Sequence, residues 1–126
     1  MKRAPRILPF LLAVVVVATP FYGQQPTGTV TGMVLDKDGK TPLAGAVIQI
    51  DSLVKLSDGR MALRERVLTK TIRDGRYRYS EVLAGRIRIT VIVNNQPVMS
   101  YGGDDIVVLE GRETVADFDL SKAPAN

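Results

Sequence analysis

Apolar and polar residues alternate with a period of two through most of the chain after residue 28. This alternation places every second side chain on the same face of an extended segment, so it predicts half-buried strands rather than helices. The clearest example is residues 86–93, where aliphatic side chains share one face and Arg86, Arg88 and Thr90 share the other. Shorter stretches with the same pattern are residues 30–34, 46–50, 77–79 and 115–120.

Turn residues separate these stretches at intervals of about 8–12 residues. Asp-Gly pairs at 38–39, 58–59 and 74–75 are typical of tight turns, because both residues tolerate left-handed backbone angles. Residues 62–73 predict a less regular strand, and a short helix at the start of this segment is the alternative. Gly102-Gly103 predicts a break between two short strands.

No helical pattern of the length that parallel α/β folds need lies between the strands. The chain is therefore predicted to be all-β. We expect a single seven-stranded antiparallel Greek-key β-sandwich preceded by a signal peptide.

Residues 1–23 have the three-part pattern of a secretory signal peptide. Three basic residues precede an almost entirely apolar run over residues 7–18. This run is shorter than the roughly 20 residues that a membrane-spanning helix needs. Small residues indicate cleavage after Ala18 or after Gly23, and retention of the segment as an N-terminal anchor is the alternative. The predicted location is exported: periplasmic, cell-envelope or extracellular.

The remaining boundaries follow from composition. Residues 24–28 predict a linker, residues 29–121 the sandwich and residues 122–126 a disordered tail. The chain has 17 Lys and Arg against 13 Asp and Glu, a net charge of +4. Three of the basic residues and none of the acidic ones lie in residues 1–23, so the rest of the chain has a net charge of +1. This balance argues against a nucleic-acid partner, which needs a marked cationic excess.

The sequence contains no His and no Cys. Catalytic systems built on a His-activated serine or cysteine are therefore excluded, and so are zinc and copper sites built on imidazole or thiolate. Asp36-x-Asp38-Gly39 resembles the start of a calcium loop, but the later ligands are missing and a solvated turn is favoured. A Lys–Asn cross-link is disfavoured because residues 115–120 contain no Asn. We expect no enzyme activity and no cofactor.

Arginine is the one residue type that stands out from this background. Seven Lys or Arg residues lie between positions 60 and 78, and Arg86 and Arg88 follow. One hypothesis is a cationic patch for an acidic partner such as a lipid headgroup, a glycan or a protein, formed by Arg60, Arg64, Arg66, Arg86 and Arg88. The alternative, which the near-neutral charge favours, is a set of solvated strand faces balanced by acidic residues. In that case Asp117 and Asp119 are candidates to pair with Arg86 or Arg88 across a sheet.

Four segments in a particular order carry a family resemblance. They are residues 30–36 (VTGMVLD), 42–48 (PLAGAVI), 71–79 (TIRDGRYRY) and 83–91 (LAGRIRITV). Together they resemble the carboxypeptidase regulatory-like domain, a transthyretin-like (prealbumin-like) β-sandwich, here in an exported, bacterial-type protein. The resemblance covers about residues 28–121. Two departures are Ala84, where the family usually has proline, and the longer, more charged stretch 51–71.

The resemblance implies that the shared residues build the fold and take no part in catalysis. Gly32, Gly45, Gly75 and Tyr77 would build the sandwich: Gly32 by allowing close approach, Tyr77 by burying its ring while its hydroxyl finds a partner. The implied function is an exported non-catalytic module with a structural or binding role in the cell envelope, and the partner would be an envelope protein or a carbohydrate. Membrane contact is expected only through an uncleaved leader. Alternatives are a small carboxylate-based hydrolase and an accessory subunit of an outer-membrane transport system.

Overall fold

The computed structural model describes residues 25–124, so the predicted signal peptide lies outside the described residues. These residues form eight strands and one short 3-10 helix. The elements are β1 (Thr27–Leu35), β2 (Val47–Lys55), β3 (Met61–Lys70), β4 (Arg76–Leu83), β5 (Gly85–Val93), β6 (Gln96–Val108), β7 (Glu113–Val115), β8 (Phe118–Asp119) and η1 (Leu120–Lys122).

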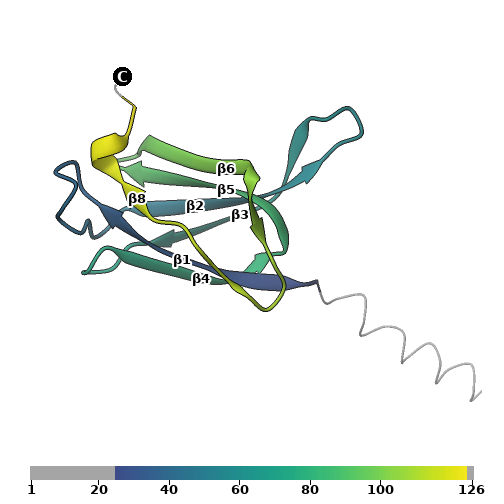
Figure 1. Cartoon of the computed structure of the whole chain (residues 1–126), viewed down its shortest axis with the longest axis horizontal. Coiled ribbons are helices and arrows are strands. Elements are labelled where there is room, and N and C mark those ends of the chain that lie inside the picture. The colour runs from purple at the N-terminus through teal and green to yellow at the C-terminus, as the bar shows by residue number, and fades with distance from the viewer. Residues whose placement is uncertain (1–24, 125–126) are drawn as a thin grey trace, which may run out of the picture.

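The strands form two sheets that pack face to face (Figure 1). One sheet has the order β4-β1-β7, with β8 also paired to β1, and the other has the order β3-β2-β5-β6. Each hairpin of the second sheet, β2–β3 and β5–β6, is followed by a return to the first sheet. The prediction of an all-β, two-sheet, mostly antiparallel sandwich is confirmed.

The last part of the chain differs in detail from the single antiparallel strand expected over residues 115–120. It forms two short strands, β7 and β8, and both pair with β1 in parallel. Between them the Asp117 carboxylate accepts a hydrogen bond from the Met33 N–H at 2.9 Å. A side chain thus replaces the backbone acceptor at the point where the ladder is interrupted, which splits the expected seventh strand into two.

The predicted break at Gly102-Gly103 is wrong, because β6 continues through both glycines. Their φ angles are +113° and +105°, which side-chain-bearing residues rarely adopt. The register shifts here, since Arg88 pairs with Gly102 whereas Arg86 pairs with Val107. The two glycines therefore form a bulge, which bends a strand without ending it. β3 is a strand throughout, so the alternative of a short helix at its start is also wrong.

The core lies between the two sheets and is built from the faces that the alternation predicted. Ile87, Ile89 and Val91 of β5 are fully buried, as are Ile48 and Ile50 of the neighbouring β2. Burying each such side chain contributes about 1.5–3 kcal/mol. The buried cluster contains aliphatic residues from both sheets together with Tyr77 and Phe118.

Tyr77 ties the first sheet together across β1. Its hydroxyl donates a hydrogen bond to the carbonyl oxygen of Ala116 at 2.5 Å. The ring passes over Gly32, where a Cβ atom would lie 2.6 Å from the Tyr77 hydroxyl and 1.9 Å from the Ala116 oxygen. Burial, and secondarily the charge of Asp117, raises the pKa of Tyr77 above its ordinary value. The roles predicted for Gly32 and Tyr77 are thus parts of one interaction.

Replacing Tyr77 by Phe removes this hydrogen bond and keeps the ring. We expect the free energy of unfolding to fall by about 1–3 kcal/mol, because the buried carbonyl of Ala116 loses its phenolic donor. Tyr101→Phe is the matched control, since Tyr101 is 50% exposed, and it should change stability little. Urea unfolding of both variants measures the difference, and equal losses would contradict the assigned role of the Tyr77 hydroxyl.

The raised pKa of Tyr77 also predicts an alkaline effect. The folded state favours the neutral phenol, so its contribution to stability is complete below the unfolded-state pKa of about 10 and is lost as the pH rises toward the higher folded-state pKa. The stability advantage of the native chain over Tyr77→Phe should therefore shrink between neutral pH and pH about 11. An advantage that stays constant over this range would argue that the phenol is not buried.

Candidate functional site

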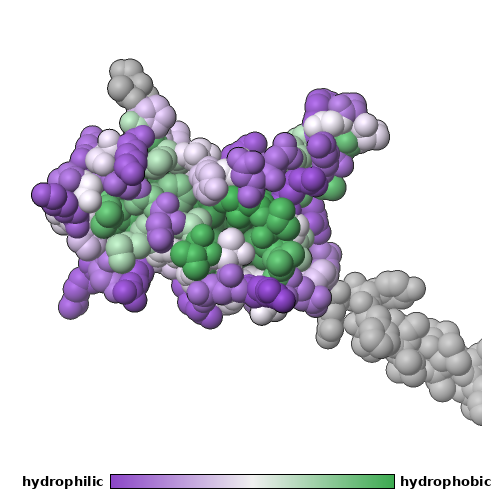
Figure 2. All heavy atoms as spheres, in the orientation of Figure 1, coloured by the Kyte–Doolittle hydropathy of each residue, from purple (hydrophilic) through white to green (hydrophobic). Residues whose placement is uncertain are grey.

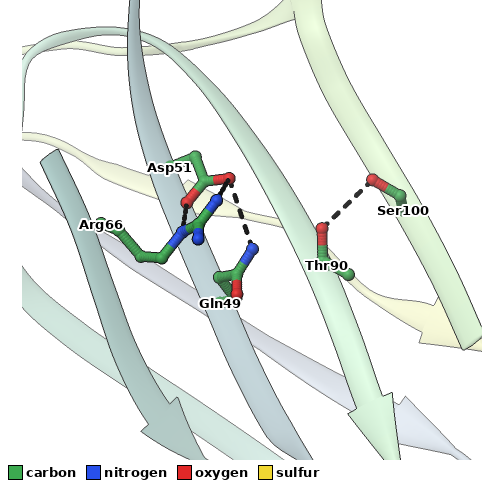
Figure 3. Close-up of polar contacts among 5 residues, drawn as sticks. All are labelled: Gln49, Asp51, Arg66, Thr90 and Ser100. Atoms are coloured by element: carbon green, nitrogen blue, oxygen red, sulfur yellow. Dashed lines mark hydrogen bonds and ion pairs between the residues drawn. The ribbon is translucent and has the colours of Figure 1, made fainter. Parts of the chain in front are cut away.

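The outer face of the β3-β2-β5-β6 sheet carries rows of polar side chains. The register places Asp51 of β2 directly between Arg66 of β3 and Arg88 of β5. In the next row of this face, Gln49 lies beside Thr90, which pairs with Ser100 of β6. The hydroxyls of Thr90 and Ser100 are 3.3 Å apart (Figure 3). Hydrogen-bonding groups from four neighbouring strands therefore share one surface.

Asp51 is the centre of this surface and is only 5% exposed although it lies on an outer face. Its carboxylate accepts two hydrogen bonds from the Arg66 guanidinium, at 2.7 and 3.2 Å, and one from the Gln49 amide at 3.4 Å (Figure 3). The hydrogen bond and the charge of Asp51 raise the pKa of Arg66. This two-point geometry fixes the guanidinium in the plane of the carboxylate and neutralises its charge.

The five arginines of the predicted patch occupy different environments. Arg60 pairs with Asp58 at 2.6 Å in the β2–β3 turn, and Arg86 lies 3.4 Å from Asp104. Arg64 donates to the carbonyl of Ala84 and to the side chain of Gln25, both at 3.4 Å. Arg66 and Arg88 are brought to the two sides of Asp51. The structure thus gives three of the five a carboxylate partner, and a common binding role for the set stays a prediction.

The suggested pairing of Asp117 or Asp119 with Arg86 or Arg88 is wrong. The two acidic residues belong to the β4-β1-β7 side of the sandwich, whereas both arginines are on β5 of the other sheet. Asp117 accepts from the backbone of Met33, and Asp119 caps η1 by accepting from the backbone and hydroxyl of Ser121. The hydroxyl and backbone of Ser121 lower the pKa of Asp119.

A groove of about 720 Å³ lies over the β4-β1-β7 sheet. Thr31 and Met33 of β1 form part of its lining, with Arg76 and Arg78 on one side and Glu113 and Asp117 on the other. Arg78 lies 3.4 Å from Glu113 across β1. The groove was not predicted, because its lining comes from β1, from the end of β3, from β4 and from residues 113–119, which are far apart in the sequence. The paired basic residues on β4 are the one sequence signal that could have indicated it.

The acidic turn over residues 36–41 is a hydrogen-bonded turn. The Asp38 carboxylate accepts from the backbone N–H groups of Lys40 and Thr41, both at 2.8 Å, and from the Thr41 hydroxyl. The Thr41 hydroxyl and these backbone groups lower the pKa of Asp38. Within residues 25–124 there is no group of three or more His, Cys, Asp and Glu side chains able to hold a metal ion. In the same part of the chain, no helix is long and apolar enough to cross a membrane.

Comparison with known proteins supports the fold. No protein-family model matches the sequence, and no curated protein matches it. Among solved structures, the Bacillus anthracis TIE protein matches with a TM-score of 0.50 and 16% identity over 75% of this chain and 16% of that protein. The minor pilin GBS52 of Streptococcus agalactiae has a TM-score of 0.49 and 16% identity over 81% of this chain and 49% of GBS52. The chain therefore spans less than half the length of either protein.

At this level of identity the similarity shows a β-sandwich fold and nothing finer. It agrees with the two-sheet architecture of the described residues. Membership of the carboxypeptidase regulatory-like family, predicted from the four sequence segments, is not shown by these matches and stays a prediction.

Removing the Arg66 side chain tests the Asp51 centre. In Arg66→Leu, the buried Asp51 carboxylate keeps only the long hydrogen bond from Gln49, so the variant should unfold at a lower urea concentration than the native chain. Because the unpaired carboxylate then favours its protonated form, the deficit should shrink as the pH falls from 7 toward about 4.

The double variant Asp51→Asn, Arg66→Leu is the control for that experiment. It carries no charge at either position, so the effect of Arg66→Leu, measured against the single variant Asp51→Asn, should not depend on pH over the same range. If the loss of stability in the single variant Arg66→Leu does not depend on pH, Arg66 does not stabilise the fold through its ion pair with Asp51.

Proposed function

We propose that this chain is an exported, non-catalytic β-sandwich module with a structural or binding role in the cell envelope. The observation that carries the proposal is the use of its carboxylates. Eight of the thirteen carboxylates in the sequence are engaged in ion pairs or in turn and strand hydrogen bonds. These residues are Asp38, Asp51, Asp58, Asp74, Asp104, Glu113, Asp117 and Asp119.

The whole sequence supports the same proposal, since it has no His and no Cys to supply a nucleophile, a general base or a transition-metal ligand. The alternative of a small hydrolase needs two carboxyl groups about 5–10 Å apart flanking a substrate in a cleft. The groove over β1 does contain Asp117 and Glu113, but Asp117 accepts from the Met33 backbone and Glu113 pairs with Arg78. Carboxylates held in this way favour recognition over proton transfer.

We further propose that the module belongs to the carboxypeptidase regulatory-like group. Gly32 and Gly75, two glycines of the resembling segments, lie where a Cβ would be 2.8 Å or less from a backbone oxygen. Tyr77, from the same segments, makes the hydrogen bond that spans β1. An accessory role beside an outer-membrane transport system, where such modules are often appended, is the second candidate that this kinship favours.

The first test is the location of the chain in its own cell. The full-length chain, detected with a C-terminal epitope tag, should be found in the envelope or extracellular fraction. A variant with Leu11, Val14 and Val16 replaced by Asp should remain in the cytoplasm, because an export signal needs an uninterrupted apolar run. Both forms in the cytoplasm would contradict export.

The second test is partner capture by crosslinking in the native envelope. Arg88 is exposed on the outer face of its sheet and lies beside the Asp51 centre. If this face binds the partner, we expect Arg88→Glu to weaken capture of an envelope protein or glycan. Arg73→Glu is the matched control, because it makes the same charge change in the turn before β4. If Arg88→Glu captures the same partner as the native chain, the cationic face is not the binding surface.

A further inference from the structure

The two ends of the sandwich differ in polarity. One end carries the turns between β1 and β2, β3 and β4, and β5 and β6, which are rich in Asp, Asn and Gly. The other end carries the start of β1, the β2–β3 turn and the β6–β7 turn (Figure 1). Exposed large aliphatic side chains gather at this second end. They are Val54 (43%), Leu56 (38%), Leu63 (52%), Val107 (47%) and Leu109 (54%).

Contacts with β1 and β5 place Leu109 and Val107 at this end. Leu109 is next to the start of β1, because its carbonyl would lie 2.5 Å from a Cβ on Gly28. Val107 pairs with Arg86 at the start of β5. Figure 2 shows the largest apolar area of the visible face toward this same end. Away from this end, the exposed large aliphatic residues of the described chain are Leu68 near the end of β3 (57%), Ile72 in the β3–β4 turn (63%) and Val115 on β7 (62%).

Residues 53–63, here called the arm, extend this apolar end. β2 pairs with β5 only as far as Ser52, whereas it pairs with β3 up to Lys55. The arm is thus a two-stranded ribbon without a third strand, and such ribbons are marginally stable in water unless another surface covers them. Val54 pairs with Ala62 and Leu63 with Leu53, so the bulge-shifted register puts apolar side chains on both faces of the ribbon.

Apolar residues on both faces suit a surrounding apolar medium better than a groove that covers one face. The arm contains two basic residues, Lys55 and Arg60, and one acidic residue, Asp58, so its net charge is +1. A small positive charge suits the headgroup layer at the surface of a bilayer. Long basic side chains can keep their charged ends in the headgroup layer while their stems lie in hydrocarbon. Anionic headgroups attract such residues.

Gln25, the first described residue, lies at the same end. The Gln25 side chain accepts a hydrogen bond from Arg64, which adjoins the arm on β3. The apolar run over residues 7–18 is joined to Gln25 by six residues, a connection of at most roughly 25 Å. If that run is held in a bilayer, the arm end faces the same bilayer at short range.

We propose that the arm and the adjoining apolar end of the sandwich form a docking surface for a lipid bilayer. The arm lies at the level of the headgroups, with Val54, Leu56 and Leu63 toward the hydrocarbon, and the polar end of the sandwich points away. The biological setting rests on the proposed export, but contact with lipid is measured on the purified chain. Its failure is therefore distinguishable from a failure of export.

The test uses the full chain, whose lack of cysteine allows one label at a chosen site. Leu56→Cys, on the arm, and Lys37→Cys, at the polar end, each carry an environment-sensitive fluorophore. Vesicles of phosphatidylcholine and phosphatidylglycerol containing brominated lipid quenchers are then added. We expect a blue shift and quenching of the label at position 56 and neither at position 37. Equal responses at the two sites, or no response at position 56, would overturn the proposal.

A second set of variants separates contact from mere proximity. Val54→Ser and Leu63→Ser together, in the Leu56→Cys chain, should reduce quenching several-fold, because each half-exposed side chain loses apolar contact with lipid. Ile72→Ser, at the polar end, should leave it unchanged. A blue shift that needs no vesicles and grows with protein concentration would assign the arm to a second copy. A shift produced only by solubilised envelope proteins would assign it to a protein partner, and either result contradicts lipid docking.

Discussion

The hydrogen bond from Tyr77 to Ala116 over Gly32 is the interaction on which the first sheet depends. β4, β1 and the β7–β8 segment are distant in sequence, and β7 and β8 contribute only three and two residues of ladder. A short parallel ladder is weak by itself. The phenol adds a buried contact that reaches across β1 and holds the last strands against it. Only glycine at position 32 leaves room for that contact.

With the sandwich closed in this way, the polar and charged side chains that could contact a partner lie on the outer faces of the two sheets. The β3-β2-β5-β6 face holds a neutralised Asp51–Arg66 pair beside exposed Arg88, and the groove over β1 is spanned by the Arg78–Glu113 pair. In both places, acidic and basic side chains hold each other in ion pairs. The proposed structural or binding role rests on these outer faces, and the proposed contact with a bilayer rests on the apolar end.

Local rules predicted the parts of the fold that depend on neighbouring residues. Period-two alternation identified the core face of β5, and the Asp74-Gly75 pair identified the turn before β4. The missed features depend on residues far apart in sequence. The bulge at Gly102 is set by the approach of the Ile87 carbonyl, and the parallel direction of β7 is set by the chain crossing from β6. The partner of each arginine likewise depends on the strand register, which cannot be predicted from the amino-acid composition.

The most direct measurement is the stability and amide protection of Gly32→Ala. The added methyl group would lie 1.9 Å from the Ala116 oxygen, so β1 must separate from the β7–β8 segment. We expect a loss of about 1–3 kcal/mol or more, and fast hydrogen exchange at the Ala116 N–H, which bonds to Thr31 in the native chain. Gly59→Ala is the reference variant, because Gly59 has a φ of +89° and no atom within 4 Å of an added Cβ. It therefore introduces backbone strain without a steric clash. Equal stability of the two variants, with Ala116 still protected, would contradict the account.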